Sequence, residues 1–149
     1  MVKDLQLLAS LAKIGAIAAL IFPAIGSALG TWAAGSAAIG AWKKCYMQNK
    51  PAPFMLVAFV GAPLSQTIYG MILMGNILKS PGQGVDSMGA GILGGVAIGI
   101  SAWLQGLAAA GASNALAETN QGFGNYLMAL GVIETVALFV LVFIGKTLS

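Results

Sequence analysis

The sequence predicts an all-α membrane protein of four transmembrane helices, arranged as two duplicated helical hairpins. Hydrophobic residues make up 58% of the chain and charged residues only 7%, whereas a soluble domain carries about 25% charged residues. Three short polar breaks divide the chain into four apolar segments. The first and third segments are alike in composition, and so are the second and fourth, which indicates the duplication.

Composition also excludes several classes of protein. The 149 residues suit one domain, and the net charge of +3 comes from seven lysines and four acids. These lysines are scattered, so they cannot form the basic face that a nucleic-acid partner requires. The single cysteine, Cys45, excludes an intrachain disulfide. The apolar segment at the start of the chain continues through Ile39. This segment is too long to be the hydrophobic core of a signal peptide.

The polar breaks locate the four spans. A membrane-spanning helix needs about 20 mostly apolar residues, and the breaks leave segments of that length or more at 5–44, 53–79, 87–117 and 122–147. The first is long for one span, so its start is expected to lie along the membrane interface or to project beyond it. Asp86 and Ser87 are expected to cap the third helix, because short polar side chains favour that position.

An internal repeat supports the two hairpins, predicted at 1–80 and 81–149. The stretch "ALGTWAAGSAA" (28–38) aligns with "LQGLAAAGASN" (104–114) through small residues. The second and fourth segments instead carry Phe, Met, Leu and Val side chains. Each hairpin is therefore predicted to pair a small-residue helix with a large-residue helix.

Small residues recur every fourth position in the first and third segments. Such stripes let membrane helices approach closely. We expect these two helices to form a tightly curved inner wall where many copies crowd together, with packing glycines at Gly26, Gly30, Gly91, Gly95, Gly99 and Gly106.

Glu134 is the strongest functional candidate from the residues alone. It lies 12 residues into the fourth segment, about 18 Å along a helix and so near the middle of a hydrocarbon core about 30 Å thick. A charge there costs about 2.5–3.5 kcal/mol on insertion scales. No lysine lies at that depth, so another neutralising partner is expected.

Polar residues of two other segments lie at the same depth. Ala62, Ser65, Gln66 and Tyr69 are spaced i, i+3, i+4 and i+7 and therefore share one helix face. Gln105 of the third segment is at a similar distance from its loop. If the hairpins pack side by side, these residues meet Glu134 at one level.

The chemistry of this set favours a monovalent cation. Pro63 removes a backbone donor and bends its helix, which can turn the Ala62 carbonyl toward a ligand. The other oxygens are the Glu134 carboxylate, the amide oxygens of Gln66 and Gln105, and the Ser65 hydroxyl. Because Ca²⁺ sites usually recruit several carboxylates, a single acid among neutral oxygens indicates Na⁺. Tyr69 is expected to hold Glu134 in place.

At these residues the sequence resembles the proteolipid, or K subunit, of bacterial V-type (V/A-type) rotary ATPases. The resemblance extends over nearly the whole chain and includes "PLSQTIYG", "LQGLAAAG" and "VIETVALF". The sodium-pumping members carry Pro-x-Thr-Gln-x-x-Tyr, Gln-Gly and Glu-Thr patterns. Matched residue by residue, these correspond to Pro63, Ser65, Gln66, Tyr69, Gln105, Gly106, Glu134 and Thr135. Ser65 departs from the pattern but keeps the hydroxyl of Thr, and Ala62 replaces a usually larger residue.

The resemblance implies a ring of identical copies in the bacterial inner membrane, in contact with lipid. The ring turns against a static membrane subunit that supplies an essential Arg, and loops 45–52 and 118–121 hold the central-stalk subunits. Glu134 would bind Na⁺, be neutralised by it, and release it when the Arg competes for the carboxylate. No covalent chemistry is expected in this chain.

Three alternatives remain open on the sequence alone. The same ring could carry H⁺ only. The chain could be a small pore-forming or structural membrane protein in which Glu134 is incidental. It could also be a small secondary transporter, since inverted repeats place polar residues at mid-membrane. However, each half of this chain has an even number of spans. The two halves therefore have the same orientation in the membrane and do not form an inverted repeat.

Overall fold

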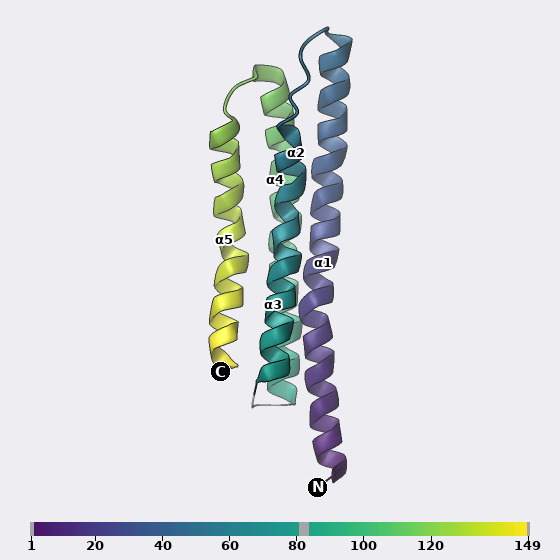
Figure 1. Ribbon diagram of the computed structural model, residues 1–149, viewed down its shortest axis with the longest axis vertical. Coiled ribbons are helices and arrows are strands. Elements are labelled where there is room, and N and C mark those ends of the chain that lie inside the picture. Colours follow the sequence, from purple (N-terminus) through teal and green to yellow (C-terminus); the bar gives the residue numbers. More distant parts are fainter. Residues whose placement is uncertain (1, 81–83, 149) are drawn as a thin grey trace.

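The computed structural model describes residues 2–80 and 84–148, and all regular structure within these ranges is helical (Figure 1). In chain order, the helices are α1 (Val2–Met47), α2 (Leu56–Gly61), the short 3₁₀ helix η1 (Ala62–Leu64), α3 (Ser65–Lys79), α4 (Val85–Thr119) and α5 (Phe123–Thr147). The predicted all-α class is confirmed.

Four helical segments in the described part of the chain are long and apolar enough to cross a membrane: α1, the combined segment Leu56–Lys79, α4 and α5. They agree with the four predicted spans to within about three residues at each end. The chain is an integral membrane protein. The predicted boundary between the two halves adjoins residues 81–83, which lie outside the described residues, so the division into 1–80 and 81–149 stays a prediction.

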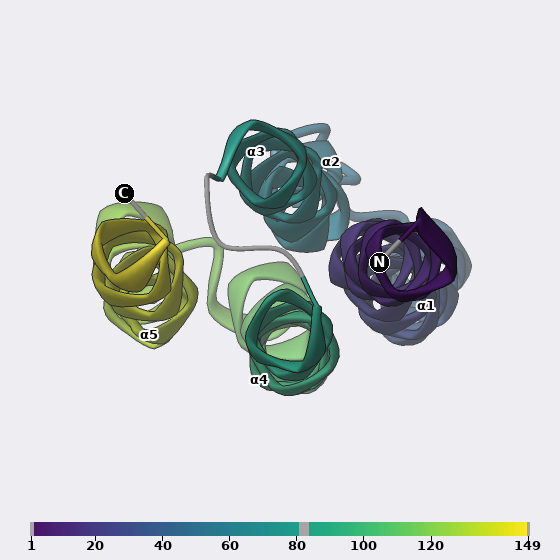
Figure 2. The ribbon, with the colours of Figure 1, turned by 90° about the horizontal axis from the view of Figure 1, so that it is seen from below.

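The small-residue helices α1 and α4 are in backbone contact. Seen along the bundle, α4 lies between α1 and α5, and α3 lies across from it (Figure 2). A Cβ atom added at Gly26 would lie 2.0 Å from the Gly99 carbonyl oxygen, and one at Gly106 would lie 2.2 Å from Gly30 Cα. Real Cβ atoms are not found at such distances from backbone atoms. The glycine stripes therefore face each other within one chain.

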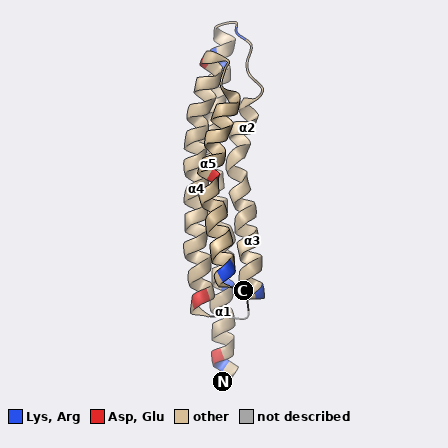
Figure 3. Cartoon of the chain, turned by 90° about the vertical axis from the view of Figure 1, so that its left-hand side faces the viewer, with Lys and Arg blue, Asp and Glu red and all other residues tan. Residues whose placement is uncertain are grey.

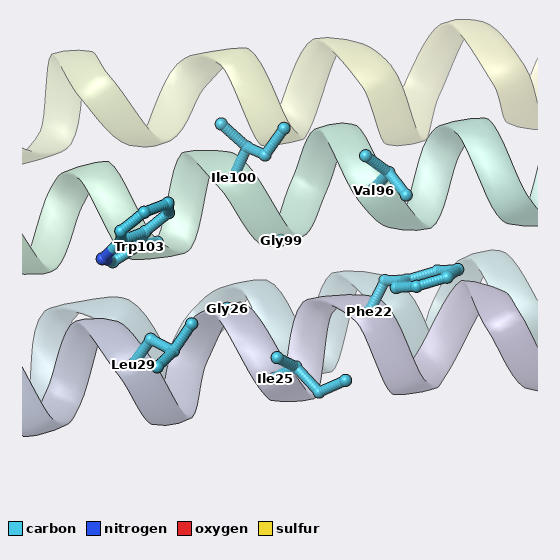
Figure 4. A pocket seen from close by; sticks show the side chains of 8 residues that line it. All are labelled: Phe22, Ile25, Gly26, Leu29, Val96, Gly99, Ile100 and Trp103. Carbon is cyan, nitrogen blue, oxygen red and sulfur yellow. The ribbon is translucent and has the colours of Figure 1, made fainter.

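The same contact recurs lower on the two helices. A Cβ atom at Gly91 would lie 2.0 Å from the Gly15 carbonyl oxygen, and one at Gly95 would lie 2.6 Å from that of Ala18. We call this line of glycine contacts between α1 and α4 the seam. Outside the seam the two helices carry large apolar side chains, as Figure 4 shows for Ile25 on α1 and Trp103 on α4. These two side chains are 50% and 44% exposed, so this face is suited to lipid or to another copy of the chain.

The first helix extends past the rest of the bundle. Figure 1 shows the N-terminal end of α1 beyond the ends of α3 and α4. The side chain of Leu8 lies beside Gly84, immediately before α4 begins. The start of the chain is therefore a continuation of α1 past the ends of α3 and α4, and its place relative to the membrane stays a prediction.

The prediction that Asp86 and Ser87 cap α4 is wrong. The helix begins at Val85, and its N-cap is Gly84, with φ +118° and no side-chain cap. Glycine adopts this backbone conformation at little cost. A Cβ atom at Gly84 would also lie 2.7 Å from Leu8 Cδ2, so close packing against α1 further favours glycine there.

The predicted bend at Pro63 takes the form of a 3₁₀ turn. The second span is α-helical as far as Gly61, tightens into η1 at Ala62–Leu64, and resumes as α3. Pro63 is buried, and its Cβ lies 2.9 Å from where a Cβ of Gly30 would be. The break in the second span is thus held against the glycine stripe of α1.

Candidate ion-binding site

Glu134 lies at the middle of its helix. Helix α5 runs from Phe123 to Thr147 and is centred on residue 135. Figure 3 shows charged residues gathered toward the two ends of the bundle, apart from one acidic position midway along it. Glu134 is half-buried, and it is the only acid of α5. Its position midway along α5 agrees with the position along the fourth span expected from the sequence.

Two donors from two different helices hold the Glu134 carboxylate. The Tyr69 hydroxyl of α3 donates to Oε1 over 2.5 Å, and Gln105 Nε2 of α4 donates to Oε2 over 3.3 Å. Both bonds stabilise the charged carboxylate, because a hydrogen bond to an ionised group is stronger than one between neutral groups. The carboxylate is therefore fixed between three helices.

The orientation of the Gln105 amide is set by α5. Besides Glu134 Oε2, its Nε2 donates to the Leu130 carbonyl oxygen over 3.0 Å. Since an amide nitrogen has two hydrogens, both are used on α5. The Gln105 oxygen consequently faces α3, where it accepts a hydrogen bond from Gln66 Nε2 over 2.8 Å. Both glutamines are fully buried.

Ser65 joins two further oxygens to this group. Its Oγ lies 3.1 Å from the Ala62 carbonyl oxygen and 3.1 Å from Gln66 Oε1. A hydroxyl has one hydrogen, so it can donate to only one of these two acceptors at a time. Ala62, Ser65, Gln66 and Gln105 therefore present more acceptor oxygens than the neighbouring hydrogens satisfy.

The structure thus brings together Ala62, Ser65, Gln66, Tyr69, Gln105 and Glu134, the set that the sequence places at one depth. It does not bring in Thr135, whose hydroxyl donates to the Val132 carbonyl oxygen of its own helix over 2.7 Å. Pro63 contributes through the shape of η1. We define the six residues of this set as the Glu134 cluster.

Sequence reasoning missed Ser101. It is buried, and its Oγ donates to the Ile133 carbonyl oxygen over 3.3 Å, which ties α4 to α5 next to Glu134. Its spacing could have identified it, because Ser101 and Gln105 are one helical turn apart on the same face.

One carboxylate dominates the chemistry of this cluster. Among the described residues, no group of three or more His, Cys, Asp or Glu side chains could hold a metal ion. Sites for soft metal ions use thiolate ligands, and Ca²⁺ sites usually use several carboxylates. The cluster instead has one negative charge and, besides the Tyr69 hydroxyl that donates to it, four neutral oxygens, which suits a hard monovalent cation or a proton.

A comparison with protein families matches the part of the chain that carries Glu134. Residues 88–144 match the family model of the C subunit of ATP synthase. The match covers less than half of the chain, lies within α4 and α5, and includes both Gln105 and Glu134. It supports a relationship to the proteolipids that form the rotor rings of rotary ATPases. No curated protein matches the chain.

Proposed function

We propose that the chain is the rotor-ring subunit of a bacterial V-type ATPase or ATP synthase, and that it carries Na⁺ across the cell membrane on Glu134. The observation that carries the proposal is the Glu134 cluster. Its acid lies within the segment that matches the ATP synthase family and is held by two donors, Gln105 of the same segment and Tyr69 of the second span. Identical copies form the ring, and the ring turns against a static subunit.

The cluster explains how an acid can pass through lipid. An ionised carboxylate at mid-membrane costs about 2.5–3.5 kcal/mol on insertion scales, and a bound cation removes that net charge. The loaded site can then face lipid while the ring turns. Release requires a competing positive charge, which an Arg of the static subunit supplies. The chain binds and carries an ion, and no bond is made or broken.

Sodium is favoured over a proton by the surplus of acceptors. A proton needs only the carboxylate and one partner, and Tyr69 already provides a partner. The Ala62 carbonyl oxygen and Gln66 Oε1 share one Ser65 hydrogen, while Gln105 Oε1 retains a second lone pair. A cation among these oxygens would use the lone pairs that the hydrogens leave unused.

The amides alone do not require a cation. Gln66 and Gln105 are hydrogen-bonded to each other, so their burial is already compensated in part. Na⁺ is therefore favoured by the number of oxygens around Glu134, and the same ring carrying H⁺ is the alternative outcome of the test below.

The shape of the chain supports a ring. Helices α1 and α4 meet at backbone contact, whereas α3 and α5 pack through larger side chains such as Leu73 and Leu141. The bundle is therefore narrower on the side of α1 and α4 than on the side of α3 and α5. Copies of such a wedge-shaped chain, packed side by side, close into a ring with α1 and α4 inside.

The connections after α1 and α4 lie at the same end of the bundle (Figure 1), where Lys44 and Glu118 form an ion pair of 2.6 Å. This end is the proposed contact with the central stalk.

The experiment is carbodiimide modification of Glu134 in the purified oligomer across a range of pH, since the reagent attacks protonated carboxyl groups. Millimolar Na⁺ should slow the modification, and K⁺ should do so much less. The protection should weaken as pH falls, because protons compete for the same carboxylate. If Na⁺ gives no protection even at alkaline pH, the ring carries H⁺ instead.

A further inference from the structure

Two buried hydroxyls of α1 have no hydrogen-bond partner within the described residues. They are Ser27 Oγ and Thr31 Oγ1, and the Ser27 side chain is only 2% exposed. A buried polar atom without a partner costs free energy, and such atoms are uncommon in folded proteins. Their spacing of four places both hydroxyls on one face of α1.

The contacts between α1 and the second span give the register of this face. Gly70 lies against Pro23, because a Cβ atom added at Gly70 would lie 2.8 Å from Pro23 Cγ, and Pro63 lies against Gly30 in the same way at 2.9 Å. The two segments run in opposite directions (Figure 1). Between these two contacts, Ser27 is therefore opposite Gln66.

The same register places Thr31 opposite Ala62. Both unpartnered hydroxyls thus lie on α1 at the level of proposed ligands of the cation, and α1 and α5 lie on opposite sides of the second span (Figure 2). Two unpartnered hydroxyls at unrelated places in the bundle would be unremarkable. Two that face Gln66 and Ala62 suggest a shared role in the site.

The Gln66 amide nitrogen has a hydrogen that a hydroxyl oxygen such as Ser27 Oγ can accept. Its nitrogen carries two hydrogens, and the acceptor found for it is Gln105 Oε1. To coordinate a cation together with Gln105, Gln66 has to turn its oxygen toward Gln105 and its nitrogen away. The amide nitrogen then lies where Oε1 lies now, 3.1 Å from Ser65 Oγ, which can accept one of its two hydrogens. The second hydrogen needs a further acceptor within the buried bundle.

We propose that Ser27 is a positioning residue of the ion site, whose hydroxyl accepts an N–H of Gln66 when that amide turns its oxygen toward the cation. This inference rests on the proposed function. Ser27 does not touch the ion and acts only through Gln66. Its hydroxyl is without a partner while Gln66 Nε2 donates to Gln105 instead.

The test is Ser27→Ala, with Ser113→Ala as the matched control. Ser113 is also a fully buried serine of a small-residue helix, but its hydroxyl donates to the Ala109 carbonyl oxygen of its own helix. The Na⁺ concentration that half-protects Glu134 from carbodiimide should rise about threefold to tenfold in Ser27→Ala, as expected for one lost hydrogen bond. It should be unchanged in Ser113→Ala. Ser27→Cys, with a similar shape and a weak acceptor, should behave like Ser27→Ala.

Two further measurements separate positioning from general damage. Without Na⁺, the pH of half-maximal modification should be the same in Ser27→Ala and the parent, because Ser27 acts only in the loaded site. In a Gln66→Leu background, Ser27→Ala should have no additional effect on the remaining Na⁺ protection, since the group it positions is gone.

The inference is overturned if Ser27→Ala leaves Na⁺ protection unchanged, shifts the Na⁺-free pH profile, or weakens protection equally in the Gln66→Leu background. Failure of the proposed function looks different, because Na⁺ would then give no protection in the parent oligomer either.

Discussion

Tyr69 Oη lies 2.5 Å from Glu134 Oε1 and joins α3 to α5 at mid-membrane. The two residues come from different hairpins, so this hydrogen bond fixes the acid of the second half against the first. The bond covers one carboxylate oxygen and leaves Oε2 facing Gln105, and the two oxygens therefore have different surroundings.

Tyr69→Phe should loosen the carboxylate while leaving the rest of the cluster in place. The variant removes only the hydroxyl, so packing is preserved and the oligomer should assemble. Because Oε1 loses its donor, Glu134 should react with carbodiimide several-fold faster, and half-protection should need several-fold more Na⁺, in line with one hydrogen bond to a charged group. Tyr126→Phe, which removes a hydroxyl outside the cluster, serves as the control. An unchanged modification rate would contradict the role of Tyr69.

The backbone contact between α1 and α4 predicts that even a methyl group at the seam is not tolerated. In Gly106→Ala the new Cβ would lie 2.2 Å from Gly30 Cα, whereas at Gly111, on the same helix, a Cβ would meet nothing within 4 Å. Alanine favours a helix over glycine by about 1 kcal/mol, so Gly111→Ala should be neutral or stabilising. Gly106→Ala should lower the yield of oligomer strongly, and Gly30→Leu or Gly106→Leu should abolish it. Size by native gel is the measurement, and intact oligomers from all three seam variants would exclude the close seam.

Each chain should carry one ion-binding carboxylate. The first hairpin has Gln66 at the level where the second has Glu134, and an amide supplies no charge. The other three acids, Asp4, Asp86 and Glu118, lie near helix ends. Carbodiimide should therefore modify Glu134 alone, and Glu134→Gln should abolish both the modification and ion transport. Peptide mass mapping that finds a second stoichiometric modification within the membrane would contradict this.

The ion pair between Lys44 and Glu118 should matter little for stability. It joins the ends of α1 and α4, but the two side chains are 52% and 57% exposed, and water screens the attraction between exposed charges, so such pairs contribute little to stability. Lys44→Ala should thus change the temperature at which the oligomer dissociates by a few degrees at most. The stronger link at this end is the hydrogen bond of 2.7 Å from Trp42 Nε1 to the Pro53 carbonyl oxygen, so Trp42→Phe should have the larger effect.

Much of the fold could be predicted from the sequence because apolar runs and polar breaks are a strong signal in membrane proteins. The spans and the depth of Glu134 follow from those runs alone. Helix ends were less predictable. Asp86 and Ser87 have capping side chains, yet the close approach of Leu8 and the positive φ at Gly84 decide where α4 begins, and neither is visible in a local pattern.

The members of the Glu134 cluster could be predicted because four of them share one face of one helix. Their hydrogen bonds could not, since the direction of an amide depends on atoms from another helix, as the Leu130 carbonyl oxygen shows for Gln105. Ser27 could not be predicted for a related reason, whereas the spacing of Ser101 from Gln105 was a usable signal. A single serine among small residues reads as packing until the register of the facing helix is known.

Na⁺ binding at Glu134 is tested most directly by the number of Na⁺ ions bound by the purified oligomer, measured with radioactive sodium at alkaline pH in the presence of excess K⁺. We expect one Na⁺ for each chain, lost in Glu134→Gln and retained in Ser113→Ala. An oligomer that binds no Na⁺ under these conditions, although Glu134 still reacts with carbodiimide, would show that the ring does not carry Na⁺.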